Sequence, residues 1–159
     1  MEQPGNVYLK RERLAELENE LRELKTKKRK EIALKIAEAR SHGDLSENAE
    51  YDAAKEEQSH LELKIAKLEH MLSRAIVIDE GSMPEDQIHI LSHVRVKDLT
   101  YDEEITFELV SPEEADFELD KISVTSPLGK ALLGKKVGDK VSVDVQNGVI
   151  EYLILEIIK

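Results

Sequence analysis

The chain has 159 residues, of which 40% are hydrophobic and 36% charged, and its formal net charge is −11. This length suits one ordinary domain or two small ones, and the charged fraction exceeds the roughly 25% of an average soluble domain, which favours long solvated helices. The absence of cysteine excludes disulfides and thiolate metal sites. No run approaches the roughly 18 to 20 apolar residues of a membrane span, and no signal peptide precedes the first charged segment, so we expect a cytoplasmic protein.

The negative charge is concentrated in the second half of the chain. Residues 1–78 carry 15 Lys and Arg against 16 Asp and Glu, whereas residues 79–159 carry 8 against 18. Such a balance argues against a protein that coats nucleic acid by itself. A partner protein with basic surfaces, or a complex that already holds nucleic acid, fits better.

The first predicted element is a helix from about Lys10 to His42, a segment without proline or glycine that is rich in strong helix formers. Its apolar stripe consists of Leu14, Leu17, Leu21, Leu24, Ile32, Ile36 and Ala39. The basic run KTKKRK (25–30) interrupts this stripe and predicts locally weak helix pairing. The run is either a solvated face paired with nearby glutamates or a contact for nucleic-acid phosphates, with Arg40 further along.

A second helix is predicted from a more regular stripe. Its members are Ala54, Gln58, Leu61, Ile65, Leu68, Leu72 and Ala75. Both stripes are narrow, as in the seam of a coiled coil. Because only a few residues join the two helices, they must lie antiparallel, in a hairpin about 45 to 50 Å long.

The predicted tip of this hairpin, SHGDLSENAE (41–50), combines a glycine with several acids. Gly43 suits a left-handed helix end. In one interpretation, Asp44 caps the second helix and Glu47 completes a capping-box pair. In the other, the two carboxylates are hard oxygen ligands for Mg²⁺ that complete a site whose remaining ligands lie on a partner.

After Ile78 the pattern changes to that of a small α+β domain with a mostly antiparallel sheet. DEGSMPEDQ (79–87) is a predicted linker. Runs with strand character follow at 94–99, 105–110, 122–126, 140–145 and 149–157. Gln146-Asn147-Gly148 indicates a hairpin between the last two, and the segment 127–139, which begins with proline, predicts one short helix.

Two segments resemble a known family. IAEARSHGDLSENAEYDAAKEEQ (36–58) resembles the tip segment of the bacterial Gre transcript-cleavage factors, in particular of their GreA branch. ADFELDKISVTSPLGKALLGKKVGD (115–139) resembles the core of that family's C-terminal FKBP-like domain. The resemblance covers nearly the whole chain and implies two domains: a coiled-coil hairpin at 1–78 with its acidic tip at 42–52, and an FKBP-like domain at 79–159 that docks on RNA polymerase.

The resemblance implies a transcription elongation factor that is not itself an enzyme. The C-terminal domain would dock at the rim of the secondary channel of RNA polymerase, and the hairpin would pass down the channel to the active centre. There, Asp44 and Glu47 would help to hold a second Mg²⁺ ion shared with the polymerase, which then cleaves backtracked RNA and escapes arrest. The isolated protein is expected to be a monomer without a cofactor, to meet the nascent RNA 3′ end, and to reach DNA only through the elongation complex.

The resemblance also assigns further candidate residues. Ser46, Asn48, Glu50 and Tyr51 would support the tip. Lys25, Lys27, Lys28, Arg29, Lys30 and Arg40 would form a basic patch that contacts RNA. Asp120, Ile122, Ser123, Ser126, Pro127 and Leu128 would face the polymerase, although several of them suit core or turn positions equally well.

Three other interpretations stay open. An inhibitory paralogue would occupy the same channel without promoting cleavage, but this tip follows the cleavage-factor pattern without an insertion. A peptidyl-prolyl isomerase would need an aromatic-lined pocket, and the second half supplies only Tyr101, Phe107, Phe117 and Tyr152. A plain scaffolding coiled coil would not need the acidic tip.

Overall fold

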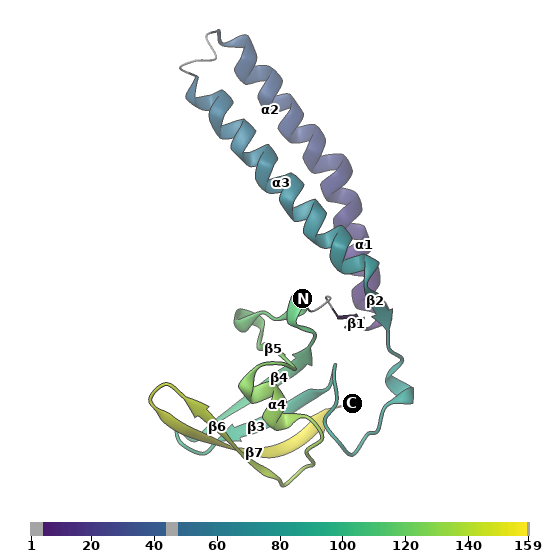
Figure 1. Cartoon of the computed structure of the whole chain (residues 1–159), viewed down its shortest axis with the longest axis vertical. Coiled ribbons are helices and arrows are strands. Elements are labelled where there is room, and N and C mark those ends of the chain that lie inside the picture. The colour runs from purple at the N-terminus through teal and green to yellow at the C-terminus, as the bar shows by residue number, and fades with distance from the viewer. Residues whose placement is uncertain (1–4, 44–47, 159) are drawn as a thin grey trace. The chain divides into compact units, whose positions relative to one another are not determined.

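The computed structural model of the chain describes residues 5–43 and 48–158 (Figure 1). It contains two compact units, Glu12–Ala75 on the one hand and Met1–Arg11 with Ile76–Lys159 on the other. None of the helices in the described ranges is long and apolar enough to cross a membrane.

The first unit is a helical hairpin, as predicted. Its first arm consists of α1 (Arg11–Glu23), a π-helical turn η1 (Leu24–Lys28) and α2 (Arg29–Ser41), and its second arm is α3 (Ala49–Ser73). Ion pairs join Lys25 to Glu69, Arg29 to Glu62 and Lys35 to Glu57, so residue numbers rise along one arm as they fall along the other. The two arms therefore run antiparallel (Figure 1).

The predicted stripes form the seam between the arms. The buried stripe residues are Leu17, Leu24, Ile32, Ala39, Ala54, Leu61, Ile65 and Leu68. One position near the end of α3 was predicted wrongly, because Met71 is buried and Leu72 only half-buried. A step of three from Leu68 keeps the side chain on the same helix face as well as a step of four does.

The π turn η1 corrects the prediction of one continuous α-helix in the first arm. Leu24 and Ile32 are both buried in the seam, yet they lie eight positions apart, one more than a heptad. The Arg29 N–H donates to the Leu24 carbonyl, five residues back, so the wider turn absorbs the extra residue. The Thr26 hydroxyl also donates to the Arg22 carbonyl at 2.7 Å, a side-chain bond of the kind that bends helices.

The second unit is built on a five-stranded sheet in the order β5-β4-β3-β7-β6. The strands are β3 (His93–Asp98), β4 (Glu103–Val110), β5 (Lys121–Ser123), β6 (Lys140–Val145) and β7 (Gly148–Ile158). Neighbouring strands are antiparallel except for β4 and β5, which are parallel, so the predicted mainly antiparallel sheet is confirmed. Val145 pairs with Gly148 across the predicted β6–β7 hairpin.

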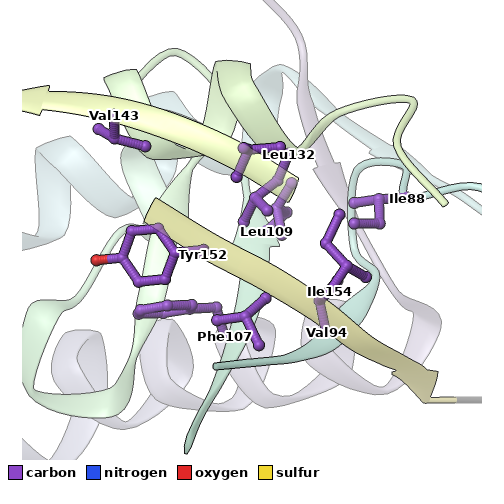
Figure 2. Close-up of a cluster of buried hydrophobic side chains, with 10 residues drawn as sticks. Ile88, Val94, Phe107, Leu109, Leu132, Val143, Tyr152 and Ile154 are labelled. Atoms are coloured by element: carbon purple, nitrogen blue, oxygen red, sulfur yellow. The ribbon is translucent and has the colours of Figure 1, made fainter. Parts of the chain in front are cut away.

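A short helix, α4 (Pro127–Leu132), closes the core of this unit. Leu132 is fully buried among strand residues that include Leu109 and Ile154 (Figure 2). A Cβ on Gly129 would collide with the Ser123 carbonyl, so only glycine lets α4 pack this closely on β5. The predicted helix at 127–139 is shorter in the structure, since Gly134 already has a φ of +80°.

The N-terminal strand β1 (Val7–Leu9) pairs with β2 (Ala75–Val77) and belongs to the sheet-containing unit. Val7 and Leu9 are buried, and the Tyr8 N–H donates to the buried Ser111 hydroxyl at 2.9 Å. The division at residue 78 that we drew from the sequence therefore differs from the compact units. A strand of three residues is too short to show a period.

Candidate functional site

The structure describes the residues on either side of the hairpin tip, up to Gly43 and from Asn48 onward. The predicted catalytic residues Asp44 and Glu47, and Ser46 between them, lie outside the described residues. On the near side, α2 ends at Ser41 and Gly43 has a φ of +109°, which confirms the predicted left-handed helix end.

Asn48 links the two arms on the far side of the tip. It is the N-cap of α3, where its side-chain oxygen accepts a hydrogen bond from the Tyr51 N–H at 3.1 Å. Its amide nitrogen donates to the Ala39 carbonyl near the end of α2 at 2.6 Å. The interpretation of Asp44 as the N-cap is therefore wrong, because α3 begins after Asn48 and this one side chain joins the end of α2 to the start of α3.

Two further contacts join the end of the first arm to the start of α3. The Arg40 guanidinium lies 5.9 Å from the centre of the Tyr51 ring, a cation–π distance. The His42 Nε2 lies 3.7 Å from a Glu50 carboxylate oxygen. Arg40, which the resemblance grouped with the basic patch, thus contacts a tip-support residue. His42 lies within the predicted tip, but the sequence assigned it no role.

The basic run is divided between paired and unpaired cations. Lys25 pairs with Glu69 and Arg29 with Glu62 across the arms, and Lys28 pairs with Glu31 within its own arm. By contrast, neither Lys27 nor Lys30 has an ion-pair partner within residues 5–43 and 48–158. The salt bridges confirm the interpretation as a face paired with glutamates for three residues of the run, and the contact with phosphates stays a prediction.

The six candidate docking residues fall into two groups. Ile122 and Leu128 are half-buried and pack against the core. The Ser126 hydroxyl is the N-cap of α4 and donates to the Ser123 carbonyl at 2.6 Å, while the Ser123 hydroxyl contacts that of Thr125 at 2.6 Å. These four residues contribute to the fold, whereas Asp120 and Pro127 are exposed.

The candidate metal ligands Asp44 and Glu47 lie outside the described residues, so the shared Mg²⁺ site stays a prediction. The described part of the chain contains no group of three His, Asp or Glu placed to hold a metal ion. Glu50 is exposed and lies against His42. Carboxylate oxygens are ligands that Mg²⁺ accepts one or two at a time, with the remaining positions filled from elsewhere.

Comparison with known proteins identifies the family. The chain matches the model "Transcription elongation factor, N-terminal" over residues 7–77 and the model "Transcription elongation factor, GreA/GreB, C-term" over residues 83–159. The chain belongs to the GreA/GreB family of transcription elongation factors. The predicted family and general function are thus confirmed.

Similar proteins cover nearly the whole chain. It is 53% identical over 152 residues to "Transcription elongation factor GreA" of Chlorobaculum parvum, covering 95% of this chain and 96% of that one. It is 55% identical over 153 residues to the factor of the same name from Thermoanaerobacter pseudethanolicus, covering 96% and 98%. The crystal structure of GreA factor homolog 1 (Gfh1) of Thermus thermophilus is 32% identical, with coverage of 97% and 99% and a TM-score of 0.46.

Proposed function

We propose that this elongation factor stimulates the RNA polymerase's own cleavage of backtracked RNA by delivering the carboxylates of Asp44 and Glu47 to the active centre. The observation that supports this most is the link made by Asn48. Asn48 bonds to the Ala39 carbonyl near the end of α2 and to the Tyr51 N–H in the first turn of α3, and the acidic segment lies between these two helices in the sequence. Because these bonds fix the end of α2 against the start of α3, these two helix ends lose little entropy when the tip binds.

In this proposal, Asp44 and Glu47 hold Mg²⁺ together with residues of the polymerase. When bound there, the ion would supply positive charge near the attacking and leaving oxygens of the RNA phosphate. The factor itself performs no hydrolysis, since its carboxylates only complete and position a site that belongs to the polymerase. Glu50 and Tyr51 act in support, through His42 and Arg40 respectively.

Two other parts of the chain contribute to binding. Lys27 and Lys30, with no salt bridge in the described ranges, contact the phosphates of the displaced RNA 3′ segment. The sheet-containing unit docks at the rim of the secondary channel as a monomer, with Asp120 and Pro127 exposed toward the polymerase. In this proposal the factor reaches DNA only through the elongation complex, and it acts in the cytoplasm together with the polymerase.

The test is RNA 3′-end cleavage in a stalled, backtracked RNA polymerase complex. The wild-type chain is compared with Asp44→Asn and Glu47→Gln, and polymerase affinity is measured alongside. We expect strong stimulation by the wild type and a loss of at least about a hundredfold in each variant, with affinity unchanged. Wild-type binding without cleavage would instead favour the inhibitory interpretation, in which the chain only occupies the channel.

A further inference from the structure

An almost fully exposed aromatic side chain lies on the sheet-containing unit. Phe117 is 92% exposed and Leu119 is 64% exposed, and both belong to one short 3₁₀ turn, Phe117–Leu119. Of the large hydrophobic residues in the described ranges, Phe117 is the most exposed. Two large apolar side chains displayed within three residues differ from the isolated exposed leucine that most surfaces carry.

The turn that carries these side chains is held rigidly. Asp116 and Lys121 exchange two backbone hydrogen bonds of 2.9 and 3.0 Å, which close the turn at its base. The Asp116 carboxylate accepts the Glu118 N–H at 3.1 Å, and the Asp120 carbonyl accepts the Glu108 N–H of β4 at 3.0 Å. Because the turn is already ordered, a partner that covers it loses little entropy in fixing it.

The surroundings of the turn are acidic. Residues 111–121 carry five acids against the single base Lys121. No ion pair engages Glu118 or Asp120 within the part of the chain that the structure describes. A surface of this kind is complementary to an apolar pocket bordered by basic side chains.

We infer that Phe117 and Leu119 are the apolar anchor by which the sheet-containing unit binds a partner protein, in an apolar pocket with a basic rim. This inference rests on the proposed function, under which the partner is RNA polymerase. Phe117 and Leu119 then take the place of Ile122 and Leu128 as the predicted apolar docking residues, because Ile122 and Leu128 pack against the core. The exposed Asp120 and Pro127 would then lie at the edge of the same contact.

The chain offers a matched control at another turn. Tyr101 is a 69% exposed aromatic residue between β3 and β4. Its turn is also ordered, since the Asp98 carboxylate accepts the N–H groups of Thr100 and Tyr101 at 2.8 and 3.1 Å. Replacing Tyr101 by alanine removes a comparable exposed ring without touching the proposed anchor.

The experiment measures the affinity of the full chain for core RNA polymerase, and RNA cleavage at saturating factor. We expect Phe117→Ala to raise Kd by about thirtyfold or more, as at a binding hot spot, and Leu119→Ala to raise it less. Tyr101→Ala should leave Kd unchanged, and no variant should change the melting temperature, because the removed groups are exposed. At saturating concentration, Phe117→Ala should cleave as well as the wild type.

The outcomes separate this inference from the proposed function. Wild type that fails to bind or to stimulate cleavage would overturn the proposed function and the anchor with it. Wild type that binds and cleaves, with Phe117→Ala binding equally well, would overturn the anchor alone, as would an equal loss in Tyr101→Ala. A lower association rate for Glu118→Lys at low salt would support the basic rim, and an unchanged rate would contradict it.

Discussion

Asn48 shows how a single side-chain amide can join the ends of two helices. In one interpretation of the sequence, Asp44 caps the second helix, and local preference does not separate Asp from Asn at such a position. The structure begins α3 after Asn48, whose amide has both an acceptor for the Tyr51 N–H and a donor for the Ala39 carbonyl. Only a view of both arms reveals this second bond, so a capping preference read along one helix could not predict it.

Two substitutions at this position separate the two bonds. Asn48→Asp keeps the acceptor for the Tyr51 N–H but loses the donor to the Ala39 carbonyl, and Asn48→Ala loses both. We expect both variants to lower cleavage at saturating factor by about ten- to a hundredfold, because the tip carboxylates would no longer be held in the orientation that the reaction needs. Asn48→Ala should also lower the free energy of unfolding by about 1 kcal/mol, as cap removal does.

Cleavage assays and urea unfolding measure these effects, with polymerase affinity as the control. The affinity should stay at the wild-type value, since Asn48 lies in the hairpin and not in the docking unit. Wild-type cleavage by Asn48→Asp would show that the bond to the Ala39 carbonyl has no positioning role.

At the scale of elements, the apolar periods predicted most of the fold. The stripes at steps of three and four located both arms, and the alternating runs located all five strands of the main sheet. The π turn was visible in the sequence only as a spacing of eight between Leu24 and Ile32, which we interpreted as a gap in the seam. Because hydrogen bonds to the carbonyl five residues back absorb the extra residue, the seam continues past it.

Deleting Thr26 tests this account of the first arm. The deletion restores a spacing of seven between Leu24 and Ile32 and removes the hydroxyl that bonds to the Arg22 carbonyl. We therefore expect an uninterrupted α-helix, slower hydrogen exchange across residues 25–32, and a melting temperature equal to or above that of the wild type. Circular dichroism at 222 nm measures the helix content and the melting temperature, and hydrogen exchange measures the protection of residues 25–32.

A deletion in the other arm is the matched control. Removing Lys67 breaks the regular spacing between Ile65 and Leu68, where no π turn exists to absorb the change. It should rotate Leu68 and Met71 out of the seam and lower stability by about 2 to 5 kcal/mol. Equal destabilisation by both deletions would contradict the assignment of the extra residue to η1.

At the scale of the whole molecule, the chain consists of two compact units, and in our proposal one binds the polymerase while the other presents the carboxylates. The backbone passes between them twice, at residues 11–12 and 75–76. The sequence predicted two parts but placed the N-terminal strand with the hairpin, since nothing local shows that Val7 and Leu9 are buried. The roles of Asp44 and Glu47 stay predictions, because both lie outside the described residues.

The most direct test of the central claim is the Mg²⁺ dependence of RNA cleavage by a backtracked polymerase complex at saturating factor. If Asp44 and Glu47 supply ligands, the wild type lowers the Mg²⁺ concentration for half-maximal cleavage. Asp44→Asn and Glu47→Gln should each raise that concentration by about tenfold or more, since even outer residues of metal sites change affinity by 10- to 100-fold. A half-maximal concentration that is the same for the wild type and both variants, while their cleavage rates differ, would contradict a role in holding the metal.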